Sequence, residues 1–117
     1  MSSVRTRIWV WRSDLVETGS IEGFSVEATD GSIGKVDEAT HDVGSSYIVV
    51  DTGPWIFGKK VLLPAGVIER VDRDDEMVFV ALTKEQIKNA PEFDETTYRD
   101  EAYRSSLGDY YTPYIDR

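Results

Sequence analysis

The chain has 117 residues, of which 40% are hydrophobic and 30% are charged, as is typical of one soluble globular domain. Its formal net charge is −9, and an acidic surface opposes the approach of nucleic-acid phosphates. The chain contains no cysteine, which excludes disulfides, thiolate catalysis and cysteine-ligated zinc.

The N-terminal arm, residues 1–21, contains a short apolar run, Ile-Trp-Val-Trp at residues 8–11. Charged residues follow this run at once, so it is not the core of a signal peptide, and we expect a cytoplasmic protein. In an extended conformation Trp9 and Trp11 share one face. The arm can pack on its own domain or add a strand to a neighbouring subunit. We favour packing on its own domain, because docking within one chain costs less entropy than association.

The central part, residues 22–94, shows short strands separated by turns. Asp30-Gly31 lies between two such runs and predicts a hairpin. The apolar run at residues 47–50 predicts a strand that is covered on both faces, and Pro64 should end the next strand or lie at a sheet edge. The charged residues 72–76 predict a second hairpin tip. About six short strands at regular spacing favour a mainly β fold, a small closed antiparallel β-barrel or a sandwich.

Helix signals begin only after the last predicted strand. Thr83 and Gln86 have the spacing of a capping box and predict a short helix there. A second helix is expected from Tyr98 to Leu107, where Gly108 would end it. It lies in an acidic, Tyr-rich tail, residues 95–117.

Five segments, in this order, resemble the PRC-barrel family: DGSIGKVDEA, SYIVVDTG, GKKVLLPAG, VIERVD and TKEQIKNAP. That family includes the cytoplasmic domain of the photosynthetic reaction centre H subunit and a domain of a bacterial ribosome maturation factor. The segments look especially like stand-alone bacterial members. The resemblance implies a six-stranded antiparallel barrel closed by a short helix, and a domain that acts by binding proteins. It transfers no catalytic residue.

Three large apolar residues, Trp55, Ile56 and Phe57, follow a Gly-Pro pair in a segment with turn composition. In a strand-like backbone alternate side chains face opposite ways, so at least one should point outward. The segment can cap its own core or form an interface, where Trp and Phe are favoured.

The tail carries five of the six tyrosines. We expect Tyr103 and Leu107 to pack across the β domain. Tyr110 and Tyr111 remain candidates for contact with another chain, because tyrosine combines a rigid apolar ring with a polar tip.

The alternative function is a ligand-binding or metal-binding protein, or an enzyme, that uses surface carboxylates and His41. His41 is the only histidine, and neither a nucleophile–base pair nor a metal-ligand set accompanies it in the sequence. The acidic stretch 72–76 lacks the spacing of a calcium loop. We therefore assign no catalytic, cofactor-binding or metal residues.

The sequence as a whole favours a non-enzymatic protein-interaction module. Its expected partner is a cytoplasmic protein or a second copy of the chain, with no nucleic acid and no integral membrane segment. The candidate interface residues are Trp55, Ile56, Phe57, Trp9, Trp11, Tyr110 and Tyr111.

Overall fold

The computed structural model describes residues 8–11, 20–40, 46–53, 60–91, 93–94 and 96–115. Its strands are β1 (Ser25–Ala28), β2 (Gly31–Ala39), β3 (Tyr47–Asp51), β4 (Lys60–Pro64), β5 (Ile68–Asp72) and β6 (Met77–Val80). The helices are the 3₁₀ turn η2 (Ala65–Val67), the short α2 (Lys84–Lys88) and the longer α3 (Glu101–Ile115). The fold is therefore mainly β, with a short helix after the last strand and a C-terminal helix, as the sequence predicts.

Several local predictions are confirmed. Ala28 pairs with Gly31 at the turn between β1 and β2, and Asp72 pairs with Met77 at the end of the β5–β6 hairpin. The four residues 47–50 of β3 are all buried, so this strand is covered on both faces. Thr83 caps α2 with a complete capping box.

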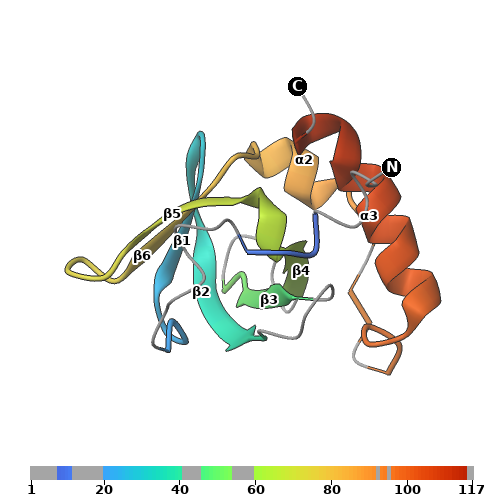
Figure 1. Cartoon of the computed structure of the whole chain (residues 1–117). Helices are drawn as coiled ribbons and strands as arrows, with labels where there is room; N and C mark the ends of the chain where they lie inside the picture. Colours follow the sequence, from blue (N-terminus) through green and yellow to red (C-terminus); the bar gives the residue numbers. More distant parts are fainter. Residues whose placement is uncertain are drawn as a thin grey trace.

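The closed antiparallel barrel is wrong. The six strands form one mixed sheet in the order β4-β3-β2-β1-β6-β5, so β4 and β5 are its two edges (Figure 1). The pair β1–β6 is parallel, and the other four pairs are antiparallel.

The reason lies in the direction of the chain at η2. The pairings of β1 with β6 and of the successive antiparallel neighbours require β4 and β5 to run the same way along the sheet. The residues Ala65–Val67 therefore do not reverse the chain. Two parallel strands need a crossover of a dozen or more residues before they can pair, and η2 is too short.

The N-terminal segment 8–11 satisfies backbone groups near this turn. The carbonyl oxygen of Ile8 accepts from the Gly66 amide at 2.8 Å, and that of Trp9 accepts from the Ser46 amide at 2.8 Å.

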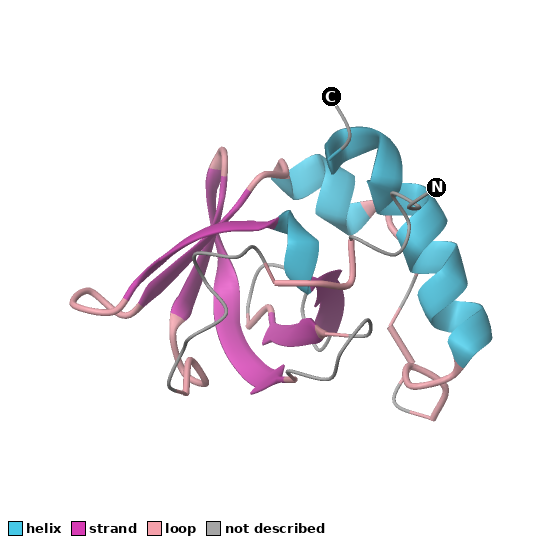
Figure 2. Ribbon diagram, in the orientation of Figure 1, coloured by secondary structure: helices cyan, strands magenta, loops and turns pink. Residues whose placement is uncertain are grey.

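The helices α2 and α3 lie together on one side of the molecule, and the β5–β6 hairpin extends away on the opposite side (Figure 2). The buried side chains of the arm and of α3 belong to the same core as those of the sheet.

Gly108 does not end the C-terminal helix, as the sequence suggested, because α3 continues through it and through Pro113. An added Cβ at Gly108 would lie 3.1 Å from Trp9 Nε1. Glycine at this position therefore allows the helix to approach the arm closely instead of stopping it.

Gly34 gives the first test of this arrangement. Its φ is +146°, and an added Cβ would overlap the carbonyl oxygen of Asp51 on β3. We expect Gly34→Ala to lower the free energy of unfolding by at least about 2 kcal/mol, because both strain and overlap must be relieved. Urea unfolding measures the loss.

Gly53→Ala is the matched control. Gly53 also has a positive φ, +56°, but apart from its chain neighbours no described residue has an atom within 4 Å of its added Cβ. We expect Gly53→Ala to lower the free energy of unfolding by only about 1 kcal/mol, which is the cost of placing alanine in a left-handed backbone conformation. Equal losses for the two variants would contradict the close approach of β2 to the end of β3.

Candidate functional site

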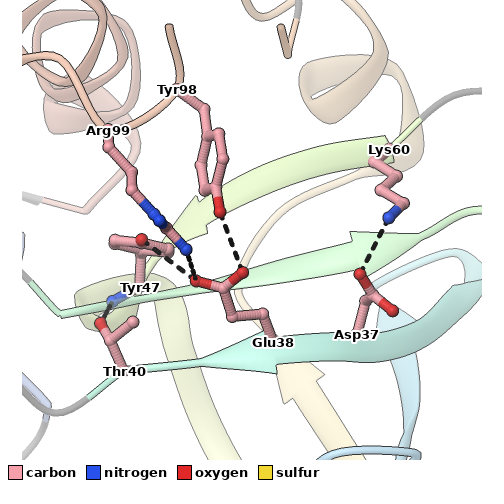
Figure 3. Close-up of polar contacts among 7 residues, drawn as sticks. All are labelled: Asp37, Glu38, Thr40, Tyr47, Lys60, Tyr98 and Arg99. Atoms are coloured by element: carbon pink, nitrogen blue, oxygen red, sulfur yellow. Dashed lines mark hydrogen bonds and ion pairs between the residues drawn. The ribbon is translucent and has the colours of Figure 1, made fainter. Parts of the chain in front are cut away.

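A polar surface forms on the side of β2, β3 and β4 that faces the C-terminal tail (Figure 3). The register between β2 and β3 shifts between Val36 and Glu38, which marks a β-bulge. A bulge breaks the alternation of side chains along a strand. As a result, the consecutive residues Asp37 and Glu38 point to the same side of the sheet (Figure 3).

The centre of this surface is the Glu38 cluster, which consists of Glu38, Tyr47, Tyr98 and Arg99. Glu38 Oε1 accepts a hydrogen bond from the Tyr98 hydroxyl at 3.0 Å, and Oε2 accepts one from the Tyr47 hydroxyl at 3.3 Å. The guanidinium Nη2 of Arg99 lies 3.5 Å from Oε2. Beside the cluster, Lys60 Nζ binds Asp37 Oδ2 at 2.9 Å. The cluster thus joins the tail to the sheet through one carboxylate.

A short turn positions the tail's part of the cluster. Asp94 Oδ1 accepts from the Thr96 amide at 2.8 Å and from its hydroxyl at 2.7 Å, and the Tyr98 amide donates to the Asp94 carbonyl at 2.8 Å. The ring of Tyr98 then packs edge-on against Tyr47, with ring centroids 6.2 Å apart. The turn therefore presents an aromatic residue and the arginine after it to the sheet.

The electrostatics of the cluster suit binding better than proton transfer. Burial raises the pKa of Tyr47. The pKa of Tyr98 is also raised, mainly by burial and to a smaller extent by the hydrogen bond to Glu38. Both phenols are therefore neutral hydrogen-bond donors near neutral pH, where they are poor general bases. What the arrangement can do is hold an aromatic ring and a guanidinium against a carboxylate.

Nothing in the sequence pointed to this cluster. Strict alternation would have sent Asp37 and Glu38 to opposite faces, and Tyr98 lies 60 residues from Glu38 along the chain. A bulge and a long-range contact of this kind leave no local pattern.

Most of the candidate interface residues that the structure describes lie in the core. Trp9, Trp11 and Tyr111 are buried, and the Trp11 indole donates to the Thr40 carbonyl at 2.9 Å. Tyr110 is half-buried, and its hydroxyl donates to the Gln86 carbonyl at 2.6 Å. Trp9, Trp11 and Tyr111 therefore present almost no surface to another molecule in this conformation.

The candidates Trp55, Ile56 and Phe57 lie outside the described residues, as does His41. The structure nevertheless fixes the two ends of the segment that contains the three apolar residues. Asp51 and Lys60 are direct partners in the β3–β4 pair. The described residues Asp51 and Lys60 therefore lie side by side, and Lys60 begins the edge strand β4.

The acidic turn 72–76 is the tip of the β5–β6 hairpin and is mostly exposed. Among the described residues, no group of three or more His, Cys, Asp or Glu side chains is arranged to hold a metal ion. Within the same residues, none of the helices has the length and apolar character needed to cross a membrane.

Comparison with known proteins gives one relative. No family model matches the chain. A protein from Deinococcus radiodurans, described as an uncharacterized protein, is 41% identical over 63 residues. The match covers 54% of this chain and 21% of that protein, so the chain spans about a fifth of its relative's length.

The tyrosines of α3 differ in how well their hydroxyls are satisfied. Burial raises the pKa of Tyr103 to about 12 and raises the pKa of Tyr111 even further. The Tyr103 hydroxyl donates to the Pro91 carbonyl at 3.3 Å, whereas the buried Tyr111 hydroxyl has no hydrogen-bond partner among the described residues. A buried hydroxyl without a partner costs free energy.

Two conservative substitutions test this difference. Tyr111→Phe should raise the free energy of unfolding by about 1 kcal/mol, because it removes an unsatisfied polar atom and leaves the ring in place. Tyr110→Phe should lower it by about 1 kcal/mol, because the hydrogen bond to Gln86 is lost. Thermal or urea unfolding of both variants measures the two signs, and a loss in Tyr111→Phe would mean that its hydroxyl has a partner.

Proposed function

We propose that this chain is a non-enzymatic protein-interaction module that binds a cytoplasmic protein partner or a second copy of itself. Its contact surface is centred on Trp55, Ile56 and Phe57 at the end of the β3–β4 hairpin. Kinship with the PRC-barrel proteins, whose known members bind other proteins, is part of the same proposal and is based on the five segments quoted above.

The observation that carries the proposal is that β4, the strand that follows this segment in the chain, is an edge of an open sheet. β4 pairs with β3 on one side, and among the described residues no strand pairs with its other side. Edge strands present backbone donors and acceptors that a partner's strand can use. The three consecutive large apolar residues that precede this strand in the sequence are of the kind that interface centres favour.

The charge of the chain favours a particular kind of partner. A net charge of −9 creates a field that assists the encounter with a basic protein and opposes the encounter of two copies. A second copy must therefore gain enough from apolar contact to offset this repulsion.

A double substitution, Trp55→Ser with Phe57→Ser, tests the surface. Light scattering gives the mass of the purified chain, and affinity capture from a cytoplasmic extract gives its partners. We expect the double variant to lose either the higher mass or the captured protein, because its apolar contact is removed.

Val10→Ser is the control, because Val10 is the one large hydrophobic side chain that the described residues leave exposed, at 42%. It removes exposed apolar surface elsewhere and should change neither result. If the wild type and the double variant are both monomeric and capture the same proteins, the proposed contact surface is wrong.

A further inference from the structure

Glu38 and Tyr47 belong to a largely apolar face of the sheet. Tyr47 and Val49 are two residues apart on β3, so they point to the same side of the sheet. Val49 is the direct partner of Glu38 on one side and of Leu62 on the other, and Tyr47 is the partner of Pro64. These five residues therefore share one face, which we call the tail-binding face.

The apolar members of this face are buried, whereas the polar contacts of the Glu38 cluster are much more exposed. Val49 is 2% exposed and Leu62 is 1% exposed. In the Glu38 cluster, the side chain of Arg99 is 70% exposed and that of its partner Glu38 is 29% exposed. An exposed ion pair of this kind contributes only about 0–1 kcal/mol.

The segment that carries Tyr98 and Arg99 has no regular secondary structure. Between α2 and α3, the described residues 89–91, 93–94 and 96–100 form no helix or strand. Phe93 and Tyr98 pack against each other, with ring centroids 4.8 Å apart, and both are only partly buried. Segments with few buried contacts open at a lower free-energy cost than the core does.

We propose that the tail-binding face is a recognition site for a segment of another protein that carries an aromatic residue followed by arginine, in a positively charged context. Tyr98 and Arg99 occupy the site as an internal stand-in for that ligand, and the partner displaces them. This inference depends on the proposed function as an interaction module, and it names a second surface and the chemistry of its partner.

The contacts of the stand-in define what fits. The ring packs on Tyr47, the phenol donates to one oxygen of Glu38, and the guanidinium approaches the other oxygen. The guanidinium also lies over the Tyr98 ring, 5.0 Å from its centroid. Arginine binds carboxylates and stacks on aromatic rings better than lysine does, so a tyrosine–lysine pair should bind less well.

Charge complementarity favours a separate, basic partner over a second copy. The carboxylates of Glu38 and Asp37 lie on this side of the sheet, and the chain as a whole carries −9. A second copy would bring its own tail, in which Asp94, Asp100 and Glu101 surround the aromatic–arginine pair. A basic segment gains from this field, whereas an acidic one is repelled by it.

The test measures binding of a labelled peptide to the full-length chain by fluorescence anisotropy. The peptide carries one tyrosine–arginine pair between lysines, and its two controls replace the tyrosine with alanine or the arginine with glutamate. The chain is used as wild type and as an opened variant, Tyr98→Ala with Arg99→Ala. Circular dichroism and thermal unfolding confirm that each variant is folded.

We expect the opened variant to bind the peptide at least about tenfold more tightly than the wild type, because a tethered competitor reduces the fraction of binding-competent chains. Adding Glu38→Gln to the opened variant should weaken binding by about tenfold, because the charged acceptor is lost. Asp75→Asn, which removes one exposed charge at the distant β5–β6 hairpin tip, should leave binding unchanged.

Three results would overturn the proposal. In the first, the opened variant binds the peptide no better than it binds the two control peptides. In the second, Asp75→Asn weakens binding as much as Glu38→Gln, which would show an unspecific charge effect. In the third, the wild type is a dimer by light scattering and the opened variant is a monomer, which would assign the face to the tail of a second copy.

The result of the peptide-binding experiment is independent of the result of the Trp55→Ser with Phe57→Ser test, because the two experiments concern different surfaces. The double variant Trp55→Ser with Phe57→Ser keeps the tail-binding face, so loss of its own partner leaves peptide binding intact. Conversely, failure of the peptide leaves the contact surface at the β3–β4 hairpin untouched.

Discussion

The direction of the chain at Ala65–Val67 decides which strands can pair and whether the sheet can close. Because η2 does not reverse the chain, β4 and β5 run the same way and become the two edges of the sheet. The last strand, β6, then pairs with β1 in parallel, and the sheet stays open. A hairpin at this place would have joined β4 to β5 and removed both edges. The open edges at β4 and β5 are consequences of this one turn.

The open sheet explains why the segments on either side of it belong to the folded core. The residues 47–50 of β3 are buried on both faces, and the buried side chains of the arm and of α3 belong to the same core as this strand. Gly108 allows α3 to approach Trp9, and the carbonyl of Ile8 binds the amide of Gly66. The arm is held by backbone hydrogen bonds and buried side chains, whereas the Tyr98–Arg99 turn is held by ring contacts of Tyr98 and by polar contacts that are exposed or only partly buried. This contrast is why the inferred site lies under the turn rather than under the arm.

Local signals in the sequence predicted the local structure well. The turn at Asp30-Gly31 and the capping box of Thr83 depend on neighbouring residues alone, and both form as expected. The way in which consecutive strands connect was not predictable, because Pro64 marks the end of β4 without giving the direction of the next strand. Gly108 was interpreted as a helix stop, since nothing in the sequence shows that Trp9 packs against it. The Glu38 cluster depends on a bulge and on a partner far along the chain, and neither leaves a periodic pattern.

Nuclear Overhauser contacts between backbone protons of the labelled chain test directly whether the sheet is open. An open mixed sheet predicts the parallel pattern between Ser25–Glu27 and Met77–Phe79, and no Hα–Hα contacts between Lys60–Pro64 and Ile68–Asp72. Close Hα–Hα pairs between these last two strands would show that they lie antiparallel and closed on each other, which would contradict the account.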